Sequence, residues 1–429
     1  MRLVLTFYLA IMVTLLGVVV PVASAQAAWL PADPNEVVSR SFPGHTFDPD
    51  ALEATSVIVV DIRTGALLFE KGPDESYGPA SLSKIVTLAL TYRAIDEGRA
   101  APDDLVLVSE RAWATNPENP HLHRSSLMWI EVGEEIPLET LMTGMIVASG
   151  NDACIAVAEH LAGSEEAFVG RMNDMVRELG MRETYLGTVH GLPAEGQKIT
   201  PRDVARLVRF FTTTYPQAEN ITSQESFTYA GITTRNYNGL VLRDERITGL
   251  KTGYTRESGY HLVATARDGD EHYAAIVMGI GAGVEDQSES EAVATREREA
   301  LALLNWAFDN FTQHTVDVGP ALPEEVRVYG GQPTSIAVRV GEDPIVTLPT
   351  GTEDQIRVEV SLGEAARAPL SRDDVIGTLN LYWEPSDDGE PVHLGLWTVH
   401  PAEELERGSW WRRMIDSILL FFQRLRGDG

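Results

Sequence analysis

Residues 56–62 and 66–70 are runs of apolar and β-branched residues on either side of Arg63-Thr64-Gly65, and this arrangement predicts a β-hairpin. The apolar positions then change to helical spacing, which predicts helices over residues 81–97, 138–147, 152–161, 165–179 and 201–211. Strand patterns return at residues 247–251, 260–266 and 272–278, and residues 296–311 predict a long closing helix. Strands, a helical insertion, antiparallel strands and a helix indicate an α+β domain whose sheet is covered by helices.

The pattern changes again over residues 316–403. Short alternating runs are separated by Gly and Pro turns with no helix of any length, which predicts a small all-β sandwich. Beyond it, residues 410–426 carry apolar residues at positions 411, 414, 415, 418, 421, 422 and 425. This is an amphipathic helix with too many charges to span a bilayer, and it predicts a segment lying in the membrane surface. A helix packed on its own domain would show the same periodicity.

The chain begins with features of a secretory signal. Arg2 precedes an apolar run over residues 3–22, which ends in Ala23-Ser24-Ala25. A retained transmembrane anchor is the alternative, because the run is near the length that spans a bilayer. We therefore expect a signal peptide over residues 1–25, a catalytic domain over 26–315, a β-sandwich over 316–403 and an amphipathic anchoring helix over 404–429.

Charge limits the possible partners of the chain, and cysteine content limits its disulfides. A formal net charge of −29 argues against nucleic acid, and against anionic lipid as a general partner away from the basic C-terminal segment. With a single cysteine, Cys154, no intrachain disulfide can form. Cys154 follows a candidate site closely, but its apolar neighbours favour a buried structural position on a helix.

Lysine is rare here, and two of the four lysines, Lys84 and Lys251, lie in short motifs; the others are Lys71 and Lys198. Ser81-Leu82-Ser83-Lys84 falls at a predicted helix start, so the amine at i+3 reaches the hydroxyl. A lysine desolvated beside a second cation can lose its proton and act as base toward a serine nucleophile. Lys251, in Lys251-Thr252-Gly253, is the candidate second cation. Either motif alone also arises by chance.

A third motif, Ser149-Gly150-Asn151, interrupts two predicted helices, so its side chains could point into a cleft. Ser149 could relay a proton to a leaving amine, and Asn151 could bind a substrate amide. Taken alone, the triplet is equally a helix cap and turn. Ser-x-x-Lys, Ser-x-Asn and Lys-Thr-Gly in this order are, however, the active-site elements of penicillin-binding proteins and class A β-lactamases.

The surrounding sequence resembles the D-alanyl-D-alanine carboxypeptidases, low-molecular-mass penicillin-binding proteins of serine peptidase family S11 that trim peptidoglycan stem peptides. Matching stretches are residues 78–84, 149–153, 162–165, 188–192 and 249–253, and the likeness extends to the Trp-Trp-Arg-Arg tail. The resemblance implies a β-lactamase/transpeptidase-like catalytic domain followed by the all-β domain and the C-terminal helix. It implies no cofactor. We also expect no metal, because His121 and His123 form a lone His-x-His without further spaced ligands.

The resemblance also implies roles for individual residues. Ser81 is the expected nucleophile and Lys84 its base, Ser149 relays a proton, and the backbone N–H groups of Ser81 and Tyr254 hold the oxyanion. The expected substrate-binding residues are Asn151, Lys251, Thr252, Gly253, Tyr254, Arg296 and His190. Arg296 is expected to bind the terminal carboxylate, because a guanidinium pairs with it in bidentate fashion.

Two features depart from the family pattern. Tyr254 stands where relatives often carry histidine, and residues 281–294 form a longer segment, which puts the reach of Arg296 in doubt. The implied partners are stem peptides ending in D-Ala-D-Ala, β-lactam antibiotics and the membrane surface. The implied location is the periplasmic face of the inner membrane. Alternatives are an endopeptidase of cross-linked peptidoglycan, a β-lactamase, or a wall-binding scaffold without catalysis.

Overall fold

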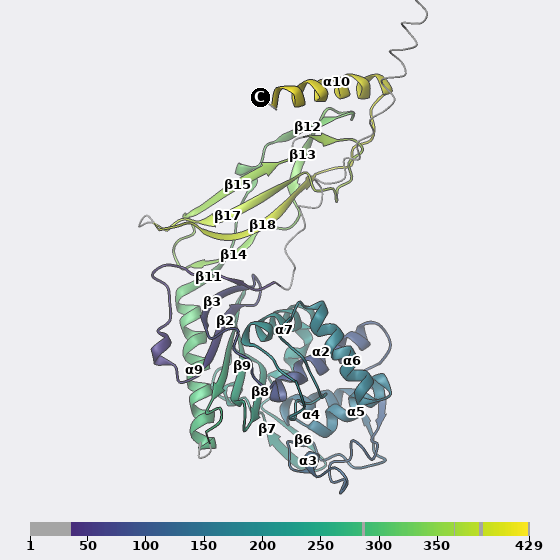
Figure 1. The fold of residues 1–429 in the computed structure, drawn as a ribbon, viewed down its shortest axis with the longest axis vertical. Coiled ribbons are helices and arrows are strands. Elements are labelled where there is room, and N and C mark those ends of the chain that lie inside the picture. The colour runs from purple at the N-terminus through teal and green to yellow at the C-terminus, as the bar shows by residue number, and fades with distance from the viewer. Residues whose placement is uncertain (1–35, 285–287, 364, 386–388, 428–429) are drawn as a thin grey trace, which may run out of the picture.

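The computed structural model describes residues 36–284, 288–363, 365–385 and 389–427. The expected signal segment, residues 1–25, lies outside this part of the chain. Within it, no helix is both long enough and apolar enough to cross a bilayer. The molecule is a mixed α/β part followed by an all-β part and a terminal helix (Figure 1).

A six-stranded sheet forms the centre of the first part, in the order β1-β3-β2-β10-β9-β8. Its strands are β1 (Val38–Ser39), β2 (Ser56–Asp61), β3 (Ala66–Lys71), β8 (Ile247–Thr255), β9 (Gly259–Asp268) and β10 (Glu271–Ile280). The predicted hairpin is confirmed, because β2 and β3 pair antiparallel. The three later strands are confirmed and are longer than expected. All neighbours pair antiparallel except β1 and β3, which are parallel.

Helices cover both faces of this sheet because its strands alternate two apolar faces. On β2, Ile58 and Val60 belong to a core shared with the helical insertion, whereas Val57 and Val59 face a second core. The insertion comprises α2 (Ser83–Asp96), α3 (Pro120–His123), α4 (Leu138–Val147), α5 (Asn151–Ala162), α6 (Glu165–Glu178), α7 (Pro201–Thr214) and α8 (Glu219–Thr222). The five predicted helices are thereby confirmed. Figure 1 shows them on one side of the sheet and α9 on the other.

Helix α9 (Glu289–Asn310) begins seven residues before the expected 296 and ends one residue before 311. The first turns of α9 are polar, so the sequence shows no apolar periodicity there. Ser288 caps this end of the helix, because its side chain accepts a hydrogen bond from the Glu291 N–H. Phe311 instead opens strand β11. The expected start of the helix was therefore wrong because a capping signal, rather than periodicity, sets it.

The all-β part contains a six-stranded sheet in the order β15-β17-β18-β13-β12-β16 and a β11–β14 pair. Its strands are β11 (Phe311–Thr315), β12 (Glu325–Tyr329), β13 (Ser335–Val340), β14 (Ile345–Pro349), β15 (Ile356–Leu362), β16 (Ala366–Arg367), β17 (Gly377–Trp383) and β18 (Val392–Pro401). The buried Asp61 carboxylate at the end of β2 accepts hydrogen bonds from Gln313 on β11 and Thr347 on β14. A polar contact thus joins the two parts.

The terminal helix α10 (Trp410–Gly427) rests on β12, at the far end of the molecule from α4 and α5 (Figure 1). Its buried face is polar: the Asp416 carboxylate, 3% exposed, accepts a hydrogen bond from the Gly330 N–H at 2.7 Å. Large apolar side chains on the helix are exposed, namely Trp410, Trp411, Met414, Ile415, Ile418, Leu419, Phe421 and Phe422. The amphipathic helix is therefore present, with its apolar residues turned outward.

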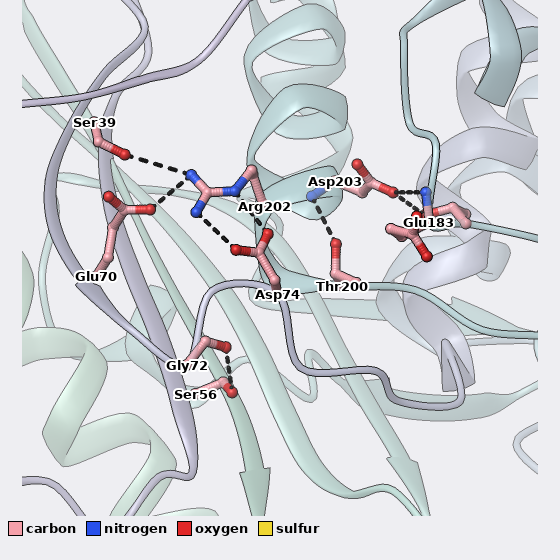
Figure 2. Close-up of polar contacts among 10 residues, drawn as sticks. Ser39, Ser56, Glu70, Gly72, Asp74, Glu183, Thr200, Arg202 and Asp203 are labelled. Carbon is pink, nitrogen blue, oxygen red and sulfur yellow. Dashed lines mark hydrogen bonds and ion pairs between the residues drawn. The ribbon is translucent and has the colours of Figure 1, made fainter.

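A polar clamp orders the chain between β3 and Ser81 (Figure 2). Arg202, in the first turn of α7, contacts Glu70 at 2.7 Å and Asp74 at 2.7 Å. The Ser56 hydroxyl donates to the Gly72 carbonyl on the same stretch. Five residues beyond Gly72, the Tyr77 N–H donates to the Ile199 carbonyl just before α7. The segment leading to Ser81 is thus held between the sheet and the helical insertion.

Candidate active site

Ser81 lies in a 3-10 turn, Ala80–Leu82, that leads directly into α2. Lys84 is in the first turn of α2 and is completely buried. Its Nζ lies 2.7 Å from the Ser81 Oγ, as the i+3 spacing predicts. The structure therefore puts an amine within hydrogen-bond reach of a hydroxyl that is itself only partly buried.

Lys84 Nζ is surrounded by oxygen acceptors. It contacts Asn151 Oδ1 at 2.6 Å, the His190 carbonyl at 3.2 Å and Ser149 Oγ at 3.4 Å. No carboxylate among the described residues forms an ion pair with it. Burial lowers the pKa of the Lys84 ammonium to about 8, against the opposing influence of Cys154 and Asp152. A lysine whose pKa is lowered in this way has a larger neutral fraction available to act as a base.

Ser149 connects the two lysines. It lies between α4 and α5 with a positive φ of 53°, and its hydroxyl is 3.1 Å from the Ser81 Oγ. Lys251 Nζ, on β8, donates to the same hydroxyl at 3.0 Å. Ser81, Lys84, Ser149 and Lys251 thus form one hydrogen-bonded network drawn from a 3-10 turn, a helix, an interhelical loop and a strand.

The Lys251 ammonium is as buried as that of Lys84. Its pKa is lowered well below the usual lysine value, first by burial and then by the positive charges of Lys84 and Arg296. Two ammonium groups in one buried network repel each other, so a positive charge on one lysine favours the neutral form of the other.

Asn151 begins α5 and is oriented by a residue that the sequence did not reveal. While its Oδ1 accepts from Lys84, its Nδ2 donates to the Ser125 Oγ at 2.7 Å. The next residue, Asp152, accepts hydrogen bonds from the N–H groups of Met128, Trp129 and Ile130. A buried aspartate needs such donors, but nothing in the sequence says which loop supplies them.

Strand β8 passes directly beside the Ser81 turn. A Cβ on Gly253 would lie 3.2 Å from the Ala80 Cβ and 3.4 Å from the Ser81 nitrogen, so the strand and the turn are already in close contact here. Thr252 is buried, whereas the Tyr254 side chain is exposed and stacks on Tyr260 with 4.2 Å between ring centroids. The expected Lys-Thr-Gly strand therefore borders the nucleophile.

Arg296, on α9, is 4% exposed despite the long segment before it. Its Nη2 donates to the Tyr237 carbonyl at 3.0 Å and its Nη1 to the His261 carbonyl at 3.4 Å. Its buried Nε has no hydrogen-bond partner among the described residues. Part of the segment that raised the doubt, residues 285–287, lies outside the described residues.

His190 contributes its backbone rather than its ring. Its carbonyl accepts from Lys84, while its buried Nδ1 accepts from the Leu192 N–H at 3.2 Å. Burial, with the charge of Lys84, lowers the pKa of the His190 imidazole to about 3, so the ring is neutral. Gly191 follows with a φ of 86°, and a Cβ there would lie 1.7 Å from the Ala80 carbonyl oxygen. Only glycine permits this approach to the Ser81 turn.

Two other sequence candidates have no part in the network. Cys154 is completely buried on α5 and its Sγ contacts the Gly150 carbonyl at 3.2 Å; burial raises the pKa of this thiol to about 12, which suits a structural residue. His121 and His123 lie on α3. Among the described residues no group of three or more His, Cys, Asp or Glu side chains could hold a metal ion.

This geometry defines a class: serine enzymes in which a buried lysine, rather than a histidine, contacts the nucleophile. A family model described as D-alanyl-D-alanine carboxypeptidase, Peptidase S11, matches residues 44–282. A second model, penicillin-binding protein 5, C-terminal domain, matches residues 312–394. The chain belongs to the peptidase S11 family.

Known relatives cover most of the chain. It is 34% identical to D-alanyl-D-alanine carboxypeptidase DacA of Escherichia coli over 88% of this chain and 89% of the relative, and 33% identical to DacC of the same organism over 89% and 92%. Penicillin-binding protein 5 from Haemophilus influenzae has a similar structure, with a TM-score of 0.73, 28% identity, and coverage of 84% of this chain and 100% of that one. Penicillin-binding protein 6B from Escherichia coli is also similar, with a TM-score of 0.66 and 32% identity. The match covers 85% of this chain and 99% of that one.

Proposed function

We propose that the protein is a serine-type D-Ala-D-Ala carboxypeptidase that removes the terminal D-alanine from peptidoglycan stem pentapeptides through an acyl-enzyme on Ser81. One observation carries the proposal: the buried Lys84 Nζ, with a pKa lowered to about 8, lies 2.7 Å from the Ser81 Oγ. Relatives that share most of the chain bear this activity in their names.

The chemistry proceeds in two steps. In the first, Ser81 Oγ attacks the carbonyl carbon between the two D-alanines while neutral Lys84 takes the hydroxyl proton. The C–N bond then breaks, and the leaving nitrogen receives a proton through Ser149, which contacts both lysines and Ser81. Free D-alanine departs. In the second step water attacks the ester carbonyl and the C–O bond to Ser81 breaks. The shortened peptide leaves with a new carboxylate, and a proton from the water restores the Ser81 hydroxyl.

Substrate binding falls to the residues around β8. The N–H groups of Ser81 and Tyr254 hold the oxyanion, and Asn151 binds a substrate amide. The carboxylate of the terminal D-alanine lies toward the Thr252 hydroxyl, which can donate a hydrogen bond to it, and toward the basic residues Lys251 and Arg296, which favour a free C-terminus. His190 supports Lys84 through its carbonyl. Such a carboxylate pocket explains cleavage at a chain end.

The same proposal covers the surroundings of the enzyme. Residues 1–25 are a signal peptide that exports the protein, 26–315 form the catalytic domain, 316–403 the β-domain, and 404–429 a peripheral anchor at the periplasmic face of the membrane. The exposed apolar residues of α10 support the anchor. β-Lactams acylate Ser81; a related penicillin-binding protein D2 from Listeria monocytogenes is known in an ampicillin-bound form, with 25% identity over 60% of this chain and 98% of that one and a TM-score of 0.50.

Three tests separate the alternatives. Release of D-alanine from a pentapeptide, without cleavage of a cross-linked dimer, identifies the carboxypeptidase; the reverse identifies the endopeptidase. A β-lactamase needs a base for rapid deacylation, yet Asp152 is occupied by backbone N–H groups and no Glu-x-x-Leu-Asn segment lies between Ser149 and Lys251. Labelled penicillin should therefore stay on Ser81 for minutes. A scaffold role predicts that Ser81→Ala leaves the cellular role intact.

A further inference from the structure

A cleft of about 660 Å³ separates the two parts of the chain, away from the Ser81 network. The β2–β3 turn and α7 line one side, and the ends of β13 and β18 with the turn before β14 line the other. Arg40, Arg63, Arg209 and Arg339 all contribute to its walls. Four guanidinium groups in one cleft are notable in a chain of net charge −29.

Three of these arginines, Arg40, Arg209 and Arg339, donate to backbone carbonyls. Arg40 donates to the Leu394 carbonyl at 3.0 Å, and Arg339 donates to the Arg372 carbonyl at 3.0 Å. Arg209 donates to the carbonyls of Glu36 and Arg63. No carboxylate among the described residues lies within ion-pair distance of Arg40, Arg63 or Arg339. A carbonyl orients a guanidinium without neutralising its charge, so Arg40 and Arg339 each present a positive charge to the cleft.

Acidic side chains also line the cleft, but at its edge. Glu36, Glu342, Asp343 and Asp373 are all exposed, whereas Arg40, Arg209 and Arg339 are partly buried. Glu36 is close enough to Arg40 to raise the pKa of its guanidinium against the larger lowering by burial. A ligand that fits this pattern places a carboxylate inside and an amino group at the edge. A polyphosphate would be repelled by four edge carboxylates.

Two side chains on β18 add further contacts. Trp397 is partly buried in the cleft, and its ring lies so close to Gly395 that a Cβ there would be 2.7 Å from it. The buried His400 Nδ1 has no hydrogen-bond partner among the described residues, while its Nε2 lies 2.7 Å from the Thr398 hydroxyl. An indole face suits a sugar ring or an aliphatic chain.

We propose that this inter-domain cleft is a second binding site that takes a carboxylate- and amine-bearing saccharide-peptide segment of the wall polymer, remote from the bond cleaved at Ser81. The identity of the polymer rests on the proposed function, whereas the charge pattern of the ligand rests on the cleft. Such a site holds the polymer while successive stem peptides reach Ser81.

The test is calorimetric titration of the full chain with a purified disaccharide-tetrapeptide, a product that lacks the scissile D-alanine. The protein is first acylated with benzylpenicillin so that Ser81 is blocked. We expect binding that becomes about tenfold weaker or more in Arg339→Gln and in Arg63→Glu, because each removes a charged donor. Arg63 is exposed, so its substitution does not threaten folding. Thermal unfolding checks each variant.

Arg171→Gln is the matched control, since Arg171 also bonds a backbone carbonyl, that of Leu161, but lies outside the cleft. It should bind as wild type does. Equal binding by all variants, no binding by wild type, or tighter binding of inorganic phosphate or of anionic phospholipid vesicles would overturn the proposal. If benzylpenicillin does not acylate Ser81, the proposed function is contradicted instead. The binding site in the cleft is then still tested by titrating the unmodified protein and its cleft variants.

Discussion

The four lysines of the chain occupy three different environments. Lys84 and Lys251 are buried in one network, whereas Lys198 forms a 3.0 Å ion pair with Glu183 at the surface. Lys71 donates to the carbonyls of Pro49 and Leu52 and so fixes the chain before β2. The motifs marked the first two from sequence. The other two gave no signal, because their partners are a surface acid and two distant backbone carbonyls.

The lowered pKa of Lys84 predicts a pH dependence for acylation. Only the neutral amine can accept the Ser81 proton, so the rate should fall about tenfold per pH unit below about pH 8 and level off above it. The measurement is the second-order rate constant for labelled penicillin between about pH 6 and 9, with thermal unfolding followed over the same range. A rate constant that does not change with pH would contradict the assignment of Lys84 as base.

Ser125, in the loop after α3, orients Asn151 by accepting a hydrogen bond from its Nδ2, so its substitution should change the rate of acylation. Ser125→Ala leaves the Asn151 Nδ2 without its acceptor, so acylation should slow by about tenfold while its pH midpoint stays in place. Ser126→Ala is the matched control. Ser126 contacts the site through its backbone carbonyl, which accepts from the Asn151 N–H, and the substitution keeps that carbonyl. Equal acylation rates in the two variants would show that the Ser125 hydroxyl does not position Asn151 for acylation.

Among the elements, helix α4 matches its predicted bounds, and the strands around the Lys-Thr-Gly motif were found, because their apolar periodicity is strong. The 3-10 turn that holds Ser81 and the early start of α9 were not found. Both depend on turn and capping geometry rather than on periodicity. Contacts such as Ser125 with Asn151 join segments far apart in the chain, and a single sequence does not encode which loop meets which helix.

Asp416 predicts how α10 is held on the β-domain. Its carboxylate accepts the Gly330 N–H and lies 3.5 Å from Arg412 and 3.8 Å from Arg327. Asp416→Ala leaves that N–H unsatisfied, so amide hydrogen exchange across α10 should speed up by about tenfold or more. Ser417→Ala, at an exposed neighbouring position, should not change it. Unaltered exchange in the Asp416 variant would mean that other contacts dock the helix.

For the whole molecule, the sequence indicated the order of its parts but not how they join. Asp61 looks like an ordinary strand residue in the sequence, yet it bridges the β2–β3 turn to β11 and β14. Burial raises the pKa of its carboxyl, against several hydrogen bonds that lower it. The cleft with its four arginines also escaped the sequence, since its residues are scattered from Glu36 to His400.

Membrane association should depend on α10 as a whole and on its outward apolar residues in particular. Deletion of residues 404–429, or Ile418→Asp on the exposed stripe, should abolish flotation with phospholipid vesicles, because the apolar face no longer inserts. Ser417→Asp adds the same charge at an adjacent exposed position and should weaken flotation less. If the deletion still floats with vesicles, another surface binds the membrane.

The most direct test of the central claim is D-alanine release from diacetyl-Lys-D-Ala-D-Ala by wild type beside Lys84→Arg. Arginine keeps the charge but does not lose its proton, so we expect release by wild type, none by a correctly folded Lys84→Arg variant, and no acylation of Ser81 in that variant. An inactive wild type would contradict the carboxypeptidase, and appreciable release or acylation in Lys84→Arg would contradict the role of Lys84.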